Sequence, residues 1–210
     1  MDPETDEDGA AGRWGRARRS RDGRPWLRAF LVIVVVPILI GAGVVLVAGR
    51  GVAFEIVRRM TVRKFPDVQW VTGAELARWR EDAGRTPPLL IDARTQVEYQ
   101  VSHLRDAVRV DALRPVIRVL KGRALNEPLV TYGSVGYRGA RLAHWLATQG
   151  FTNVRNLTGG IFEWANEDRP LFRDDRPAAQ VHPYDRRWGF MLESQFRAPL
   201  PDIETPFAAP

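Results

Sequence analysis

The sequence predicts an α/β fold in which a parallel sheet is flanked by helices and preceded by one N-terminal transmembrane helix. Three observations lead to this prediction. From residue 67 onward, short apolar runs alternate with helical patterns, as in parallel sheets covered on both faces. Residues 128–149 combine a buried strand, a glycine-rich loop and an amphipathic helix. Residues 29–49 are uncharged and dominated by Leu, Ile and Val.

Composition narrows the possible classes of protein. A chain of 210 residues fits one ordinary domain with appendages. Because it has no cysteine, disulfides, thiolate metal sites and cysteine catalysis are excluded. The net charge of +6 would suit nucleic acid, but only two of the 31 basic residues are lysines. No recognition helix or aromatic-basic pattern is present, so no nucleic-acid partner is expected.

The first 49 residues are interpreted as a tail and a membrane anchor. Residues 1–28 form a tail expected to be disordered, acidic at first and then carrying seven arginines. The 21 residues of 29–49 would span about 31 Å as a helix, the thickness of a hydrocarbon core. A cleaved signal peptide is the alternative, since residues 41–43 and Ala48 are small, but the apolar run is long for a signal.

The charges that flank this segment predict its orientation. Seven arginines precede it, and five Arg or Lys residues follow within 50–66. By the positive-inside rule the N-terminus stays in the cytoplasm. The domain would then lie outside the cytoplasm, on the inner membrane and in the periplasm if the host is a Gram-negative bacterium. Residues 50–66 are interpreted as a juxtamembrane connector, either a surface helix or helical extension or an ordinary linker.

The next 106 residues, 67–172, alternate strands with helices. Strands are predicted at 68–71, 88–92, 108–110, 129–132 and 154–157, and helices at 72–84, 96–101, 116–120, 138–149 and 161–166. Thr72 with Glu75 three residues later forms a capping box. Asp92 is the last residue of one strand, and Gly133 comes directly after another. Ligands bind beyond the carboxyl ends of parallel strands, so both positions are candidates for a site.

The loop that begins at Gly133 is the candidate site. A strand, a tight loop and a helix N-terminus direct several backbone N–H groups at one point, which suits an anion. The loop residues are Gly133, Ser134, Val135, Gly136, Tyr137 and Arg138. Arg138 adds a positive charge for an anion, or it pairs with Asp92 or Glu98. Ser134 lacks a neighbouring base, so helix capping is its expected role.

Residues 173–210 form a proline-rich and irregular C-terminal extension. Its aromatic part, 181–190, is expected to pack back on the domain, and its last dozen residues to be disordered. The histidines are scattered at His103, His144 and His182. No metal site and no cofactor are therefore expected.

The motifs of 67–172 resemble those of the rhodanese-like domain family. The matching segments are LIDART (90–95), EY (98–99), SHL (102–104) and AV (107–108), then VTYGSVGYRGA (130–140), and finally GFTNV (150–154), NLTGGIFEW (156–164) and PL (170–171). The extension resembles membrane-tethered single-domain members. In that family the first loop residue is a cysteine that carries sulfur as a persulfide. Here that residue is Gly133.

The resemblance also concerns the rest of the loop. Four residues separate Gly133 from Arg138, which is the loop length of sulfurtransferases rather than of the phosphatases that share the fold. Gly139 replaces the small hydroxyl residue that is usual after the arginine. Asp92 and Arg94 are expected to tie the strand-end turn and support the loop.

Two functional hypotheses follow. The first is a membrane-anchored rhodanese-like domain that is catalytically inactive, a pseudoenzyme that binds a small anion, a sulfur-containing ligand or a partner protein. The second, implied by the family, is a thiosulfate sulfurtransferase. The missing cysteine favours the first, because thioethers cannot carry a persulfide.

Overall fold

The computed structural model describes residues 31–110 and 113–200. The chain divides into two compact units, Met1–Val45 and Leu46–Pro210. The second unit contains the sheet, the helices that cover it and the candidate site. The predicted N-terminal tail, 1–28, and the last ten residues, 201–210, lie outside the described residues.

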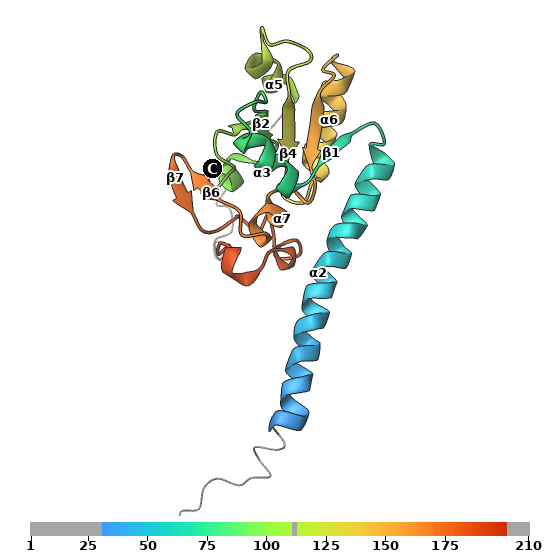
Figure 1. Ribbon diagram of the computed structural model, residues 1–210, viewed down its shortest axis with the longest axis vertical. Coiled ribbons are helices and arrows are strands. Elements are labelled where there is room, and N and C mark those ends of the chain that lie inside the picture. Colours follow the sequence, from blue (N-terminus) through green and yellow to red (C-terminus); the bar gives the residue numbers. More distant parts are fainter. Residues whose placement is uncertain (1–30, 111–112, 201–210) are drawn as a thin grey trace, which may run out of the picture. The chain divides into compact units, whose positions relative to one another are not determined.

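A five-stranded parallel sheet forms the centre of the second unit (Figure 1). Its strands lie in the order β1-β5-β4-β2-β3, and every neighbouring pair is parallel. The bounds are β1 Gln69–Val71, β2 Leu89–Asp92, β3 Val108–Arg109, β4 Leu129–Tyr132 and β5 Val154–Leu157. The prediction of a parallel α/β sheet is therefore confirmed, and every strand end lies within one residue of its predicted bound.

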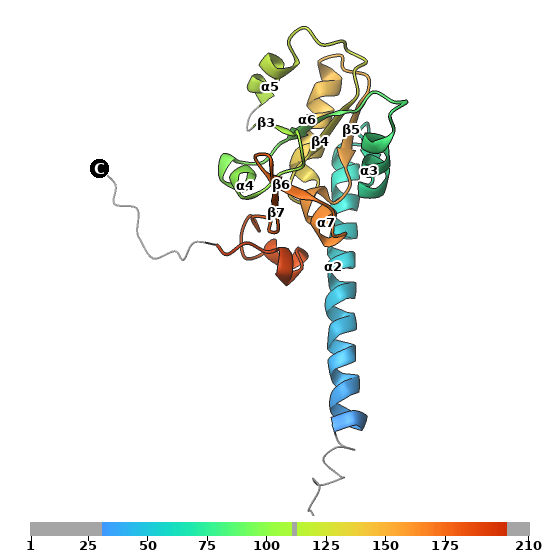
Figure 2. The same cartoon turned by 60° about the vertical axis from the view of Figure 1, so that its left-hand side comes forward.

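Helices cover both faces of the sheet (Figure 2). They are α3 Gly73–Glu81, α4 Gln96–Val101, α5 Leu113–Leu120, α6 Tyr137–Thr148 and α7 Gly160–Asn166. Successive strand residues point to opposite faces, and the core divides accordingly. Leu90 packs with residues of α3 and α7, whereas the next residue, Ile91, packs with residues of α5 and α6.

Two of these helices begin with a capping box. Thr72 and Glu75 form the predicted one at the start of α3, with side-chain to backbone hydrogen bonds in both directions. Thr95 and Glu98 form a second box at the start of α4. This second box has the same spacing but was not predicted.

Helix α2, Val36–Lys64, follows a short π-helical element, η1 Leu31–Val35. From Ala53 onward it belongs to the folded domain, because Ala53, Phe54 and Val57 pack against the core formed with α3 and α7. Arg50 adds a hydrogen bond of 3.2 Å from its Nε to the carbonyl of Phe190. Residues 50–64 of the segment interpreted as a connector, 50–66, are thus the end of a helix that contacts the domain.

The transmembrane prediction is wrong. Across 31–110 and 113–200, no helix combines the length and apolar character that crossing a membrane requires; residues 29 and 30 lie outside this part of the chain. From Val36 onward the residues of the apolar run belong to α2, whose second half is charged and packs on the domain. The predicted membrane partner, inner-membrane location and extracytoplasmic orientation are withdrawn with it.

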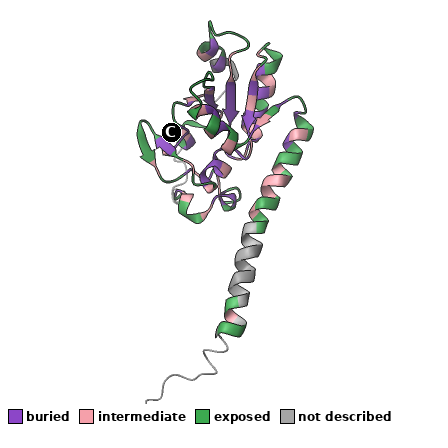
Figure 3. Ribbon diagram, in the orientation of Figure 1, coloured by how far each residue is buried: buried purple, intermediate pink, exposed green. Residues whose placement is uncertain are grey.

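The C-terminal extension packs back on the domain. An antiparallel hairpin, β6 Leu171–Arg173 and β7 Arg176–Ala178, joins the domain to the extension. The extension later forms two 3₁₀ turns, η2 Gly189–Met191 and η3 Ser194–Phe196. Val181, Met191 and Leu192 are buried in the same core as α3 and α7. Figure 3 shows purple buried segments within this region as well as along the sheet. The hairpin was not predicted.

Candidate functional site

The ends of two neighbouring strands bring the predicted site residues together. Strands β2 and β4 pair with Asp92 opposite Tyr132. The turn after Asp92 and the loop after Tyr132 therefore leave the sheet side by side. This confirms the expectation that Asp92 and Gly133 both lie at carboxyl ends of strands.

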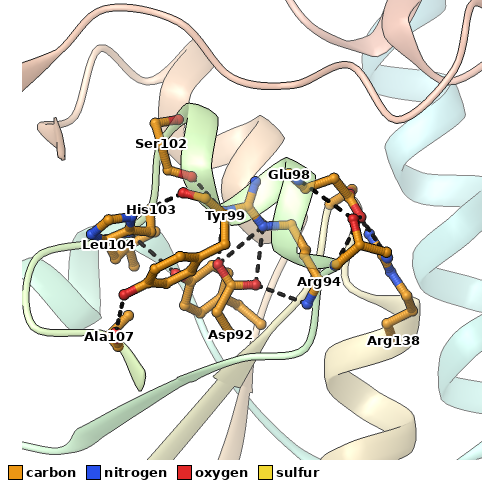
Figure 4. A network of polar contacts seen from close by, with 12 residues as sticks. Asp92, Arg94, Glu98, Tyr99, Ser102, His103, Leu104, Ala107 and Arg138 are labelled. Atoms are coloured by element: carbon orange, nitrogen blue, oxygen red, sulfur yellow. Dashed lines mark hydrogen bonds and ion pairs between the residues drawn. The ribbon is translucent and has the colours of Figure 1, made fainter. Parts of the chain in front are cut away.

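Asp92 and Arg94 form a fully buried ion pair, seen in Figure 4. Arg94 Nη2 donates to Asp92 Oδ2 at 2.7 Å and to the carbonyl of Ser102 at 2.6 Å. Burial alone would lower the pKa of Arg94, but the Asp92 carboxylate raises it above its ordinary value. The pair ties the turn after β2 to the end of α4. The pair also contacts β4, the strand that precedes the candidate loop. The guanidinium carbon of Arg94 lies 5.8 Å from the centre of the Tyr132 ring.

Glu98 joins α4 to the loop. Its Oε2 accepts hydrogen bonds from the backbone N–H and hydroxyl of Thr95, at 3.0 and 2.8 Å, and from Arg138 Nη1 at 2.8 Å. Its Oε1 accepts from the Ser134 hydroxyl at 2.8 Å and from Arg138 Nη2 at 2.5 Å. One carboxylate therefore caps a helix and holds two loop side chains. Figure 4 shows Glu98 beside Arg138.

This arrangement keeps Glu98 ionised. Burial would raise the pKa of its carboxyl, but hydrogen bonds from Arg138, Thr95 and Ser134 lower it to about 2. Asp92 and Glu98 were the two carboxylates considered as ion-pair partners of Arg138. In the structure Arg138 pairs with Glu98. The positive charge of the loop is therefore already compensated by a carboxylate whose side chain is 2% exposed.

Ser134 does not cap the helix that follows. The N-cap of α6 is Gly136, with no side-chain cap, and its φ of +98° is left-handed, a conformation that glycine adopts readily. Ser134 instead donates to Glu98 and accepts from Arg138 Nη2 at 2.8 Å. A carboxylate with a pKa of about 2 is a weak base, so this contact does not activate the serine.

The start of α7 holds the loop from the opposite side. The backbone N–H groups of Ile161 and Phe162 donate, each at 3.0 Å, to the carbonyls of Gly133 and Ser134. The backbone N–H groups of Ser134, Val135 and Gly136 find no acceptor within the described part of the chain. Successive backbone N–H groups without an internal acceptor are the kind of donors that anion-binding loops use.

Gly133 occupies the position where the resembling family has its cysteine. A Cβ atom built there would lie 3.2 Å from the Cβ of Arg138 and 3.3 Å from the backbone nitrogen of Gly139. A small side chain would thus need shifts of a few tenths of an ångström. The loop would have to make these small shifts to hold a cysteine, which the sequence does not supply.

A cavity of about 450 Å³ opens over the loop. The loop contributes Ser134, Val135, Tyr137 and Arg138; α2 contributes Val57, Met60, Thr61 and Lys64; the extension contributes Tyr184 and Trp188. Sequence reasoning missed the residues of α2, because they precede the segment with family motifs. The aromatic content of 181–190 did signal that the extension packs on the domain.

The three histidines lie apart. His103 stacks on the ring of Tyr99, with centroids 3.9 Å apart. His144 Nδ1 lies 2.8 Å from the carboxylate of Asp67. Burial lowers the pKa of His182. Within the described residues, no group of three or more His, Cys, Asp or Glu side chains could hold a metal ion.

Part of the chain is similar in sequence to tRNA uridine(34) hydroxylases. The tRNA uridine(34) hydroxylase of Shouchella clausii is 36% identical over 104 residues, which are 46% of this chain and 32% of that protein. The enzyme of the same name from Enterococcus faecalis is 29% identical over 127 residues, 54% of this chain and 40% of that protein. The chain thus spans 32% to 40% of the length of these relatives.

Solved structures resemble the chain at low identity. The rhodanese-like domain protein from Staphylococcus aureus is 22% identical, with a TM-score of 0.40, and the match covers 46% of this chain and 91% of that one. The rhodanese-related protein from Thermoplasma volcanium is 17% identical, with a TM-score of 0.40, over 50% and 99% of the two chains. The profile of the "Rhodanese-like domain" family matches residues 72–167. This part of the chain is therefore a rhodanese-like domain.

Proposed function

We propose that this protein is a non-catalytic rhodanese-like module that binds a small anionic or sulfur-containing ligand at the loop 133–138. The single observation that carries the proposal is Gly133, in the position of the family's sulfur carrier. Around it the backbone of the loop is retained, with three N–H groups directed to no acceptor in the described chain. The loop can bind without being able to react.

The chemistry of sulfur transfer explains why binding is favoured over catalysis. In the reaction that the family implies, a thiolate attacks the outer sulfur of thiosulfate, an S–S bond to the protein forms, and sulfite leaves. The chain has no cysteine. Its methionine thioethers have no proton to lose and no stable persulfide form. Ser134 is bound to a weakly basic carboxylate, so it is no substitute.

Two measurements test this function. Thiosulfate-to-cyanide sulfur transfer by the full chain should not exceed the buffer control; a clear excess would favour the alternative, a thiosulfate sulfurtransferase. Binding is followed by amide chemical shifts in NMR. Added thiosulfate should move the signals of Ser134, Val135 and Gly136 and leave those of β1 in place. Unmoved loop signals up to tens of millimolar thiosulfate would contradict binding at the loop.

The names of the relatives favour a second candidate, an RNA-related role. Both relatives are named as hydroxylases of a tRNA uridine, which speaks against the exclusion of nucleic acid that was drawn from composition. Since the chain covers at most 40% of either relative, their activity is a proposal for it and no more. Filter binding with bulk tRNA tests the candidate. Retention that falls steeply with salt would support it, because phosphate contacts release counterions.

A further inference from the structure

The cavity over the loop is lined by the rhodanese-like segment 72–167 together with residues from outside it. Six of its ten lining residues lie outside that segment, four in α2 and two in the C-terminal extension. Its volume of about 450 Å³ is within the range of small-molecule pockets, roughly 300 to 1,000 Å³. Elements added to the domain therefore shape the space above the loop.

Aromatic and apolar side chains form most of this lining. Tyr137, Tyr184 and Trp188 contribute rings, and Val57 and Met60 contribute aliphatic surface. Tyr184 and Trp188 are 48% and 37% exposed, so both rings are accessible to a ligand in the cavity. Such a lining favours a flat, apolar group.

The backbone at Tyr184 is also unusual. Its φ is +67°, a left-handed conformation that a non-glycine residue adopts at a cost. Its ring lies 5.1 Å from the guanidinium carbon of Arg138, a cation–π contact. The strained residue thus places an aromatic ring directly over the loop's arginine, at the boundary of the cavity.

The charges of the cavity favour an anion. Lys64 lines it with its Nζ 5.4 Å from the Tyr137 ring, and no carboxylate of the described residues lies within ion-pairing distance of that nitrogen. The loop adds the N-terminus of α6 and its open N–H groups. Among the described residues, the only carboxylate bound to the loop is Glu98, which is 2% exposed and fully engaged.

We infer that the cavity binds a small aromatic anion, with a planar ring against Tyr184 and Trp188 and one negative group facing Lys64 and the loop. Because Glu98 already compensates Arg138, a bare inorganic anion gains little from the arginine. The aromatic side chains that line the cavity must then supply most of the affinity for the ligand. This inference rests on the proposed function and names the class of ligand for the same site.

Isothermal titration calorimetry of the full chain with naphthalene-2-sulfonate as the probe tests the inference. Three further compounds separate the ring from the charge: methanesulfonate, neutral 2-naphthalenemethanol and cationic trimethyl(2-naphthyl)ammonium. The naphthalenesulfonate should bind at least tenfold more tightly than any of the three. Equal binding of the neutral ring would show an apolar occupant, such as an acyl chain or a peptide side chain, and would overturn the inference. Tighter binding of the cation would overturn it too.

Matched variants locate the binding. Trp188→Ala should weaken binding of naphthalenesulfonate about tenfold, whereas Phe190→Ala, which removes a similarly exposed ring that does not line the cavity, should change it less than twofold. Lys64→Gln should weaken the binding of naphthalenesulfonate about fivefold and leave the binding of 2-naphthalenemethanol unchanged. Arg63→Gln is the control, because it removes one positive charge from a residue that does not line the cavity. If Trp188→Ala binds as the wild type does, the ring lies elsewhere and the inference fails.

The outcome for this inference is distinct from the outcome for the proposed function. If thiosulfate moves the loop amides and naphthalenesulfonate binds no better than methanesulfonate, the loop binds anions and the aromatic inference alone fails. If neither compound moves the loop amides, both fail. Sulfur transfer above the buffer control would overturn the non-catalytic proposal. The calorimetry would then still decide whether the cavity binds an aromatic anion.

Discussion

The carboxylate of Glu98 and the guanidinium of Arg138 meet across 40 residues of sequence, with hydrogen bonds of 2.8 and 2.5 Å. The same carboxylate caps α4 through Thr95. The pair therefore links the turn after β2 to the loop after β4, the two segments that leave neighbouring strands. Any change at Glu98 should affect both segments at once.

The first prediction concerns this link. Glu98→Gln removes the charge that compensates Arg138 and should lower the free energy of unfolding by about 1–3 kcal/mol, as measured by urea denaturation. Glu75→Gln is the matched control, since Glu75 has the same place in the other capping box but is exposed. It should cost no more than about 1 kcal/mol. Equal costs would show that the contact with Arg138 adds nothing.

The second prediction concerns pH. The pKa of Glu98 is lowered from 4.5 to about 2, so its ionised form stabilises the fold. This contribution is complete above about pH 5 and is lost as the pH falls from the unfolded toward the folded pKa. The difference in unfolding free energy between the wild type and Glu98→Gln should therefore shrink between pH 5 and pH 2. A difference that stays constant over that range would contradict the assigned pKa.

The third prediction concerns Gly133→Cys. The built Cβ meets its neighbours at 3.2 Å or more, so the variant should fold, and the loop N–H groups and the helix N-terminus should lower the thiol pKa. After incubation with thiosulfate, intact-mass spectrometry should detect one added sulfur that cyanide removes. Gly133→Ser, of similar size, should show none. A folded, alkylatable thiol that forms no persulfide would mean that the loop no longer has the catalytic geometry.

The fourth prediction concerns Gly139, which lies where α6 crosses β4. A Cβ there would lie 2.7 Å from the Cα of Tyr132 and 2.9 Å from its carbonyl carbon. Since the clash is with backbone, Gly139→Ala should destabilise the protein by at least about 2 kcal/mol. Gly51→Ala in α2 is the control: its Cβ would meet nothing within 4 Å, and the change should stabilise the helix by up to about 1 kcal/mol. Thermal unfolding compares the two.

The fifth prediction concerns the buried pair of Asp92 and Arg94. Asp92→Asn leaves a fully buried guanidinium without its counter-charge and should cost about 3–5 kcal/mol. Asp106→Asn removes the partner of Arg80 from an exposed pair and should cost less than about 1 kcal/mol. Denaturant midpoints measure both variants. A cost at Asp92 as small as that at Asp106 would contradict a structural role for the buried pair.

Much of the fold could be predicted because its signals are local. The apolar run before Asp92 and the capping box at Thr72 predicted β2 and the start of α3, and both are confirmed. The hairpin of β6 and β7 was missed, since its strands are three residues each and β7 contains Pro177. The anchor was predicted from an apolar run alone; packing of Phe54 on the core depends on contacts that periodicity does not reveal.

The candidate site was only partly predictable for a related reason. Strand ends located Asp92 and the loop, because parallel strands place their carboxyl ends together. The partner of Arg138 was left open between Asp92 and Glu98, since the choice depends on how α4 packs. The cavity residues of α2, such as Lys64, were not found at all. They lie about seventy residues before the loop in the sequence, and they belong to no recognisable motif.

The packing of α2 and of the extension determines where the domain can be cut for expression. A fragment limited to 72–167, the segment that the family profile matches, would lack the side chains of Phe54 and Phe65 from its two hydrophobic clusters. It would also expose the surface that Met191 covers. An expressed fragment for crystallography or screening should therefore retain at least residues 46–200. Loss of ligand binding in a shorter fragment would result from the missing core residues and not from a change in the loop.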